Sequence, residues 1–546
     1  MNARAVAAAP FVVCAALYAS VIGGYFLSDD MAVIYVLSEW TERGELWHRV
    51  FSKFAAGLDA PSHYYRPLTL LSYALNQQLI QWGPVPWHLI NLAGHLAAGV
   101  AVYRISLALQ PDPVSRAGPA LAAALFLLCG TNAEAVAWIS GRYDVFATAF
   151  ALWAAALYLR SRSSFDRFAI GALACGILAL TSKESGAILP GLIGCLAWIR
   201  HDQGSWRARW IAIARDLAPW LLLIAGYFAL RLALFGSMLR VYPGTNPLER
   251  IADGGWLQAL RAMLPWLSAA LPEPPLLATA GAMFLILAAA GLLTAVRNRA
   301  LRRNATGLLA AILLSLALLL PHVGELSPAG EGGRLFYTTT ALLALLLGIP
   351  FGALRSGGPP TVASRVLVVV GLALVATQAV LLHAALRDWR IAGTQMGQLI
   401  SALPRLKESM LPDDYVFVIA PDAIGAAPFA RNANGAMVLT PIQDQQLLSS
   451  MIIFLPAQIS TVPSRLKQQL IPNLKRYTLR DANKIMEGAS TGDSAAPIVW
   501  PTRVFCWRQD AAVLAVMEMG QTWQDPISWE EEMAQGLRRA GCNNLP

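Results

Sequence analysis

Apolar runs of roughly the length that crosses a lipid bilayer recur along the first 386 residues of this chain. A membrane-spanning helix needs about 20 predominantly apolar residues. Hydrophobic residues make up 56% of the 546 residues and charged residues only 14%, against roughly 25% charged residues in a soluble domain. We therefore predict an α-helical, multi-pass membrane protein with about eleven transmembrane helices, at about 5–27, 86–109, 118–136, 143–160, 166–181, 184–200, 213–235, 276–296, 304–322, 335–354 and 366–386.

The stretch that follows the last apolar run differs in composition. Residues 390–546 have mixed polarity and contain no spanning segment, so we expect a membrane domain at 1–389 and a soluble domain after it. In the soluble part, Tyr415–Ala420 and Ala436–Thr440 are predicted to be buried strands and 441–454 a helix. These elements indicate a small α/β domain.

Basic residues between the apolar runs predict the orientation. With the N-terminus in the cytoplasm, every inside turn carries arginine and the short outside turns carry few cations, as the positive-inside rule requires. An odd number of spans then places residues 390–546 outside, on the side of the long connections at about 28–85 and 236–275. We expect a bacterial inner membrane with a periplasmic active site. Because the net charge of +9 is concentrated in these turns, nucleic acid is not an expected partner.

The six cysteines form no CxxC pair and show no Cys/His spacing suited to zinc. Four lie in or beside apolar runs and are predicted to pack as small hydrophobic side chains. Cys506 and Cys542 lie in the predicted extracytoplasmic domain, where an oxidising compartment permits a disulfide. Two cysteines in one domain do not fix the distance between them, so a disulfide and two free thiols are both open.

Two adjacent carboxylates, Asp29 and Asp30, directly follow the first apolar run. One interpretation is a solvated helix end. Carboxylates at a helix C-terminus are disfavoured by the helix dipole, and adjacent carboxylates raise one another's pKa. These costs are easier to understand if one aspartate is a general base, and both interpretations stay open.

A second polar cluster opens an amphipathic stretch, and a third lies on the next apolar run. His63, Tyr64, Tyr65 and Arg66 either anchor the chain at the lipid headgroups or form a phosphate-binding cation with aromatic walls. His88 and His95 lie two helical turns, about 10.5 Å, apart, which is too far to share one metal easily. We expect them to form hydrogen bonds between helices, with His88 near enough to the outer face to contact substrate.

Three further turns on the predicted outer face carry charge. Each has an ordinary interpretation. The first turn could form an Arg142–Asp144 or Arg142–Glu134 ion pair, the second could hold a lysine whose ammonium reaches the interface, and the third could be a solvated turn. All the polar clusters nevertheless fall on the same predicted face, whereas the inner turns hold mostly arginine. The candidate residues of these turns are Glu134, Trp138, Arg142 and Asp144, then Lys183 and Glu184, and then His322, Glu325, Glu331 and Arg334.

The order of these motifs resembles the GT-C superfamily of polyprenyl-phosphate-sugar transferases. The resemblance is closest to the membrane half of the transmembrane and TPR-containing O-mannosyltransferases, and covers about residues 10–200. The protein O-mannosyltransferases and the aminoarabinose lipid A transferases are more distant. The matching motifs are Asp29-Asp30, YRPL at 65–68, WHLINLAGH at 87–95, EAVAWISGRYD at 134–144, KESG at 183–186 and, weakly, GRLFY at 333–337.

Two departures from the family pattern limit what is carried over. The TPR array is absent from this sequence, so a protein acceptor is not assumed. GRLFY also differs from the usual family stretch, which leaves the role of Arg334 open.

The resemblance implies inverting transfer of a sugar from a polyprenyl phosphate to an unknown acceptor, without metal or cofactor. It implies that a first-loop aspartate, Asp29 or Asp30, is the general base, a role that contributes roughly 10²–10⁴-fold. A phosphate leaving group needs positive charge, which Arg66, Arg142, Lys183 and Arg334 can supply. The remaining expected substrate contacts are His63, Tyr65, His88, Glu134, Trp138, Asp144 and Glu184.

Two other functions remain open at this stage. The protein could transport a lipid-linked sugar or glycolipid, although that class favours ionisable residues near the bilayer midplane and broken helices in related halves. It could also be an envelope assembly protein that binds glycolipid through residues 390–546.

Overall fold

The computed structural model divides the chain into two compact units. The first comprises Met1–Ile22, Val50–Phe54 and Ser62–Arg387, and the second Gly23–Arg49, Ala55–Pro61 and Asp388–Pro546. The structure describes residues 3–52, 64–80, 83–110, 116–163, 166–238, most of 283–319, 322, 332–352, 362–411, most of 416–457, 503–517 and 526–542.

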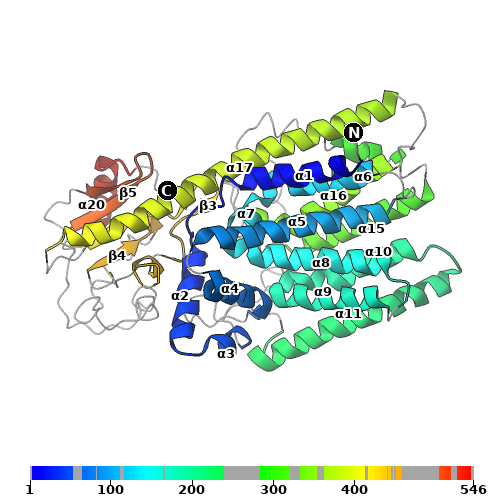
Figure 1. Ribbon diagram of the computed structural model, residues 1–546, viewed down its shortest axis with the longest axis horizontal. Coiled ribbons are helices and arrows are strands. Elements are labelled where there is room, and N and C mark those ends of the chain that lie inside the picture. Colours follow the sequence, from blue (N-terminus) through cyan, green and yellow to red (C-terminus); the bar gives the residue numbers. More distant parts are fainter. Residues whose placement is uncertain are drawn as a thin grey trace. The chain divides into compact units, whose positions relative to one another are not determined.

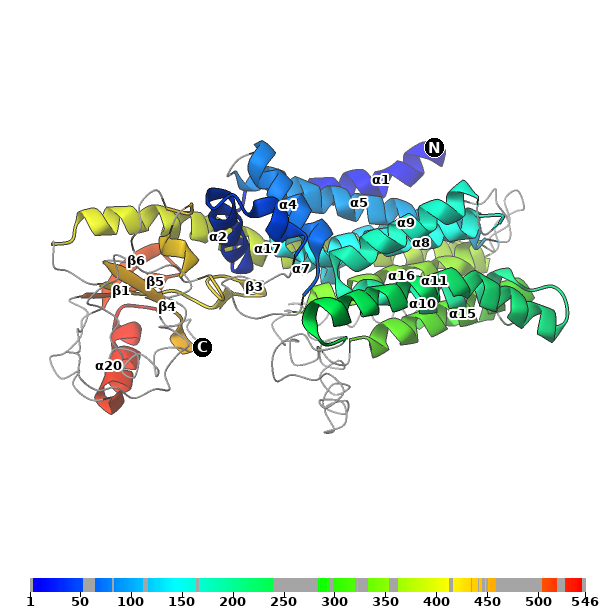
Figure 2. The same cartoon turned by 90° about the horizontal axis from the view of Figure 1, so that it is seen from below.

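Long helices that run side by side dominate the first unit (Figures 1 and 2). Short 3-10 turns separate several of them, at η1 (Gly130–Asn132), η2 (Ile139–Gly141), η3 (Glu184–Ile188) and η6 (Gly333–Phe336). The helices are α1 (Ala3–Tyr18), α4 (Pro67–Ile80), α5 (Pro84–Ala108), α6 (Ala117–Leu127), α7 (Ala133–Ala137), α8 (Arg142–Arg160), α9 (Arg167–Ser182), α10 (Leu189–Arg200), α11 (Trp206–Phe235), α15 (Arg299–Ala317), α16 (Tyr337–Gly352) and the first part of α17 (Val362–Glu408).

Burial distinguishes inner from outer helices of this unit. Every residue of α6 from Gly118 to Leu127 is buried, as expected for a helix surrounded by others. In α11 only Ile213, Trp220, Tyr227 and Arg231 are buried, a single stripe at helical spacing. The rest of α11 exposes apolar side chains, which suits contact with lipid.

Five helices in the described part are long and apolar enough to cross a membrane, or six if the bent pair of α6 and α7 is one span. The protein is thus a mostly helical, multi-pass membrane protein. Helices coincide with the predicted runs in the described residues, whereas the run at 276–296 lies largely outside them. The total of eleven spans stays a prediction.

Two predicted helix boundaries are wrong. The first run was expected to be helical to residue 27, but α1 ends at Tyr18, shortly before the Gly23-Gly24 pair, whose residues lower helix stability. The run at 118–136 is bent by 48° at the break before Gly130. The expected amphipathic helix at 66–81 is α4, and the connection at 236–275 lies mostly outside the described residues.

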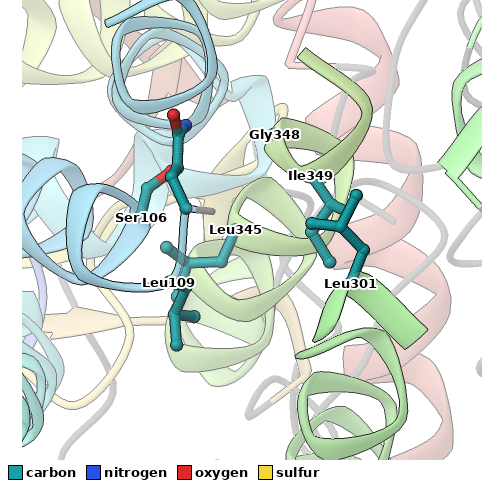
Figure 3. Close-up of a pocket in the computed structure, with 7 residues that line it drawn as sticks. Ser106, Leu109, Leu301, Leu345, Gly348 and Ile349 are labelled. Atoms are coloured by element: carbon teal, nitrogen blue, oxygen red, sulfur yellow. The ribbon is translucent and has the colours of Figure 1, made fainter. Parts of the chain in front are cut away.

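A small, mainly apolar cavity lies between α5, α15 and α16 (Figure 3). Ser106 and Gln110 supply its polar lining beside leucine and isoleucine side chains. None of the predicted site residues lines this cavity, so we assign it no part in the chemistry.

The second unit contains α2 (Asp29–Glu42), most of α3 (Leu46–Val50), the end of α17 and a four-stranded sheet. The strand order is β4-β1-β5-β6, with β1 parallel to both β4 and β5, and β6 antiparallel to β5. The elements are β1 (Val416–Ile419), a hairpin of β2 (Ala423–Ile424) and β3 (Ala427–Pro428), η7 (Ala436–Val438), β4 (Met451–Phe454), β5 (Arg503–Arg508), β6 (Val513–Met517) and α20 (Pro526–Arg539).

Predictions for this unit had mixed outcomes. The strand expected at Tyr415–Ala420 is β1, and its complete burial fits a strand between two parallel neighbours. The strand expected at Ala436–Thr440 is wrong, because a 3-10 turn forms there. The helix expected at 441–454 is wrong at its end, where β4 pairs with β1; periodicity cannot separate helix from strand in so short an apolar run.

The structure joins Cys506 of β5 to Cys542, which follows α20, in a disulfide with a Cα–Cα distance of 6.4 Å. Of the two states left open by the sequence, the structure has the paired one. The bond holds the C-terminal helix to the sheet.

Candidate functional site

The first ion pair of the candidate site joins the residue before α4 to the turn between α9 and α10. Arg66 Nη2 and Nε donate to Glu184 Oε2 at 2.7 and 3.0 Å, and Arg231 Nη1 of α11 lies 3.6 Å from Glu184 Oε1. Burial alone would lower the pKa of the Arg66 guanidinium, but the Glu184 carboxylate outweighs it and the pKa is raised. Arg66 therefore stays charged at every accessible pH.

Aromatic rings flank this guanidinium. The Arg66 Cζ lies 3.9 Å from the centre of the Tyr64 ring and 4.9 Å from that of Tyr143. A cation over a ring face is held in place by the ring quadrupole. The predicted combination of a cation with aromatic walls is present. Tyr64, one of the two expected walls, and Tyr143 form it, whereas His63 lies outside the described residues.

The second ion pair joins the adjacent Lys183 to the start of α8. Lys183 Nζ lies 2.6 Å from Asp144 Oδ1, and their side chains are 14% and 8% exposed. Asp144 is in the first turn of α8, where the helix dipole favours a carboxylate. Lys183 is thus paired with Asp144, whether or not its side chain also serves to reach the membrane interface.

The third ion pair joins α7 to η6, 200 residues later. Arg334 Nη1 lies 2.6 Å from Glu134 Oε1, and the Arg334 backbone N–H donates to Glu134 Oε2 at 3.1 Å. The Arg334 Cζ also lies 4.9 Å from the centre of the Trp138 ring. A Cβ atom at Gly333 would be 2.6 Å from the Thr131 carbonyl oxygen, so this position requires glycine for the close approach.

Arg142 differs from the other cations because its side chain is fully enclosed. It is 0% exposed, and four protein oxygens accept from it: Asn91 Oδ1 at 2.8 Å, Ser72 Oγ at 3.2 Å, Asn76 Oδ1 at 2.6 Å and the Trp87 carbonyl at 2.9 Å. Arginine has five N–H donors, so nearly all are used within the protein.

This enclosure corrects the prediction that Arg142 binds donor phosphate; we assign it to holding α4, α5 and α8 together. The expected pairs of Arg142 with Asp144 or Glu134 are also wrong, since those carboxylates pair with Lys183 and Arg334.

His95 is a structural residue, as expected. Its Nδ1 lies 2.6 Å from the Tyr337 hydroxyl and its Nε2 3.1 Å from the Leu127 carbonyl. A carbonyl only accepts, so Nε2 carries the proton and Nδ1 accepts from Tyr337. His95 thus links α5, α6 and α16. His88 is 7% exposed, near the start of α5.

The two aspartates belong to the second unit, and the structure corrects their predicted setting. They open α2 instead of ending the first helix, so the helix dipole favours them. Asp30 is 3% exposed, and its Oδ2 accepts a hydrogen bond from the Leu27 N–H at 3.1 Å. We therefore assign Asp30 to holding the start of α2 in place. Asp29 is more exposed, and its Oδ1 accepts from Asn432 Nδ2 at 2.9 Å.

The residue before this pair has a strained backbone. Ser28 has φ 49° and ψ −126°, outside the regions that residues other than glycine normally adopt. Its N–H donates to the Phe429 carbonyl at 2.9 Å, and its hydroxyl donates to the Arg431 carbonyl at 2.6 Å. Such strain costs about 1–3 kcal/mol and clusters at functional sites, and here it fixes the chain directly before Asp29.

In the first unit, several charged residues meet at one end of the helices. Four cations (Arg66, Lys183, Arg231 and Arg334) lie beside three carboxylates (Glu134, Asp144 and Glu184); we call this group the polar-end cluster. Positive charge exceeds negative charge, and Arg66, Lys183 and Arg334 are 12%, 14% and 23% exposed. These three cations are accessible to a ligand.

Sequence reasoning missed Arg231 and Tyr143 as members of this cluster. Arg231, which stands among apolar residues late in the run at 213–235, was a usable signal, because ionisable residues within membrane helices are rare and functional by default. Glu325 and Glu331, named with Arg334 in the sequence, lie outside the described residues. Within the described ranges, no group of three His, Cys, Asp or Glu side chains is placed to hold a metal ion.

No family model matches the chain. It is 28% identical over 190 residues to a protein O-mannosyl-transferase of Caenorhabditis elegans, which covers 34% of this chain and 26% of the relative. It is 36% identical over 289 residues to protein O-mannosyl-transferase Tmtc2 of Drosophila melanogaster, with 43% and 30% coverage. It is 26% identical over 214 residues to human protein O-mannosyl-transferase TMTC4, and the match covers 35% of this chain and 28% of the relative.

Part of the chain is therefore similar in sequence to protein O-mannosyl-transferases. The GT-C resemblance predicted from the motif order is confirmed by these relatives. The matched part spans about a quarter to a third of the length of the curated relatives.

Two solved structures align with this chain over much of its length. ArnT from Cupriavidus metallidurans bound to undecaprenyl phosphate is 14% identical, covers 76% of this chain and 82% of its own, and has a TM-score of 0.43. The apo oligosaccharyltransferase of Archaeoglobus fulgidus is 12% identical, with 77% and 62% coverage and a TM-score of 0.46. With TM-scores below 0.5, neither alignment contributes to the proposals below.

Proposed function

We propose that this protein is an inverting membrane glycosyltransferase that uses a polyprenyl-phosphate-linked sugar and acts on an acceptor at the extracytoplasmic side. The observation that carries the proposal is the polar-end cluster, in which three partly exposed cations accompany an excess of positive charge. A lipid phosphate is the anion that such a cluster at the end of membrane helices fits best. The motif order and the O-mannosyl-transferase relatives support the same reaction class.

In the proposed reaction, the acceptor hydroxyl oxygen forms a bond to the anomeric carbon while the bond from that carbon to the phosphate oxygen breaks. The electron pair leaves with the polyprenyl phosphate, and the acceptor proton passes to a carboxylate. A single displacement inverts the anomeric centre. The leaving phosphate is already a weak base, so it needs positive charge more than a general acid.

Arg66, Lys183 and Arg334 are the proposed phosphate-binding cations. Arg66 uses its Nε–H and one Nη2–H on Glu184, and its other donors have no partner assigned among the described residues. Lys183 uses one ammonium proton on Asp144. The paired carboxylates hold both cations in position while leaving N–H groups for phosphate oxygens, which is the preorganisation that electrostatic catalysis requires.

Asp29 is the proposed general base. The sequence left Asp29 and Asp30 equal, but the Asp30 carboxylate is buried and accepts a hydrogen bond from the Leu27 N–H. Asp29 is more accessible, and Ser28 and Asn432 fix its position. Tyr65, His88 and Trp138 remain proposed substrate contacts, whereas Glu134, Asp144 and Glu184 are better assigned to positioning the cations.

The test measures transfer by purified protein in proteoliposomes from polyprenyl-phosphate [³H]mannose to an envelope extract that lacks this chain. Asp29→Asn is expected to reduce transfer at least about 100-fold, the usual contribution of a general base. Glu42→Gln, which removes an exposed carboxylate at the far end of α2, is the matched control and is expected to keep full activity. Normal turnover by both Asp29→Asn and Asp30→Asn would exclude the proposed base.

A further inference from the structure

A hollow lined by arginine lies between helices α8, α9, α10 and α11. It is formed where α8 and α10 end and by the first halves of α9 and α11. Its charged lining residues are Arg162, Arg200, His201, Arg215 and Asp216.

This hollow lies across the bundle from the polar-end cluster. Asp144 and Lys183 lie where α8 begins and α9 ends, whereas the hollow lies where α8 ends and α9 begins. The 19 residues of α8 span about 28 Å, close to the roughly 30 Å hydrocarbon core of a bilayer. The two groups therefore suit opposite leaflets of one membrane.

Internal bonds make the wall of the hollow rigid and leave its charge positive. Asp216 Oδ2 accepts from the Tyr158 hydroxyl at 2.6 Å and lies 2.8 Å from His201 Nε2. Arg200 donates to the Ser161 carbonyl at 2.6 Å and to the Tyr158 carbonyl at 3.2 Å. Three arginines thus accompany one carboxylate.

Arg162 and Arg215 are the exposed cations of this wall. Both side chains are exposed, and neither has an ion pair assigned among the described residues. A ligand with one or two negative oxygens can be bound by both at little cost to the fold, because no existing pair is broken.

The rest of the lining is apolar and continues onto an apolar surface. Ala169, Leu173 and Trp220 contribute to the hollow, while Ile170 of α9 and Leu222 of α11 are 59% and 73% exposed. A ligand seated here meets cations at one end and a lipid-facing helix surface at the other.

Tryptophan side chains mark the same level of the bundle. Trp206 and Trp210, in the first turns of α11, are 67% and 43% exposed, and their ring centres are 5.2 Å apart. Exposed tryptophan is enriched at headgroup depth. The hollow is therefore placed at the depth of lipid phosphates.

We propose that this hollow binds the phosphodiester headgroup of an anionic phospholipid from the leaflet opposite to the polar-end cluster, with Arg162 and Arg215 as the phosphate-binding cations. Basic pockets between membrane helices recognise such headgroups. The site is independent of the proposed sugar transfer, so either proposal can fail without the other.

The experiment is native mass spectrometry of protein released from nanodiscs of phosphatidylglycerol or of phosphatidylcholine. Wild-type protein is expected to retain one phosphatidylglycerol and to exchange phosphatidylcholine freely. Arg162→Gln with Arg215→Gln is expected to weaken retention roughly 30-fold, from the contribution of two cations at a membrane surface.

The matched control is Arg299→Gln with Arg302→Gln. It removes the same charge from exposed positions at the start of α15, at the same end of the bundle because neighbouring Arg303 donates to the Trp198 carbonyl of α10 at 2.7 Å. This variant is expected to retain phosphatidylglycerol as wild type does. Thermal unfolding in detergent checks that both double variants are folded.

Three results would overturn the proposal. Equal retention of the two lipids by wild type would remove the preference for an anion. Equal loss in both double variants would mean a general surface-charge effect. Displacement of phosphatidylglycerol by millimolar inorganic phosphate would identify the ligand as a soluble phosphate instead of a lipid.

Discussion

Arg66 offers the sharpest test of how the polar-end cluster is held together. Arg66→Gln removes a two-point, charge-assisted contact with Glu184, whose hydrogen bonds are 2.7 and 3.0 Å long. Each such bond contributes about 1.5–3 kcal/mol. The side chains are 12% and 25% exposed, so solvent screening lowers the sum, and Arg231 still lies 3.6 Å from Glu184. We expect a loss of about 2 kcal/mol in the free energy of unfolding.

A double-mutant cycle isolates this contact from other effects of the substitution. Thermal unfolding in detergent is measured for Arg66→Gln, Glu184→Gln and the double variant. The expected coupling is about 1–2 kcal/mol, because residues in direct ion-paired contact do not contribute additively. Additive single effects would show that the pair does not stabilise the fold.

Activity gives a second readout that a purely structural role would not produce. Arg66→Gln is expected to lower kcat/KM for the polyprenyl-phosphate sugar about 100-fold, the usual effect of removing one electrostatic contact to a developing oxyanion. Arg66→Lys keeps the charge but loses the planar, two-point geometry. Its kcat/KM should therefore be about tenfold higher than that of Arg66→Gln. Arg104→Gln, an exposed arginine of α5 outside the cluster, is the control. If Arg66→Gln keeps the kcat/KM of that control, the reasoning is refuted.

Three further predictions concern other parts of the molecule. Gly333→Ala is expected to weaken the Arg334–Glu134 pair and lower activity, because its Cβ would lie 2.6 Å from the Thr131 oxygen; Gly226→Ala, which meets nothing within 4 Å, is the kinetic control, and equal activity would contradict the argument. Arg142→Lys should lose about 3 kcal/mol of unfolding free energy by leaving buried acceptors unsatisfied, measured by thermal unfolding; an unchanged midpoint would remove its structural role. Cys506→Ser with Cys542→Ser should lower the stability of the second unit by about 3–4 kcal/mol, from the entropy of a loop closed over 36 residues; proteolysis that is equally slow with and without the disulfide would disprove this.

The sequence predicted which turns of the first unit carry the polar residues, because charge stands out between apolar runs. It could not predict the pairing. Glu134 and Arg334 are 200 residues apart, and only the packing of α7 against η6 brings them together. Arg142 was grouped with the phosphate-binding cations because charge alone does not reveal that four neighbouring oxygens enclose its side chain.

The setting of Asp29 and Asp30 was missed for a different reason. The run from 5 to 27 is apolar throughout, so hydropathy gave no reason to end the helix at Tyr18. The Gly23-Gly24 pair was the available signal, since glycine lowers helix stability. In the second unit, β1 was predictable from its apolar residues, whereas β4 depends on parallel pairing between segments distant in sequence.

The central claim is that the protein cleaves the bond between sugar and lipid phosphate at its polar end. The most direct measurement follows a doubly labelled polyprenyl-phosphate mannose, with ³H in the sugar and ³²P in the phosphate, in proteoliposomes that contain purified protein and envelope acceptor. We expect free polyprenyl [³²P]phosphate in an amount equal to that of the [³H]-labelled product. Donor that crosses the bilayer with both labels still joined, and no labelled product, would contradict it and indicate a transporter.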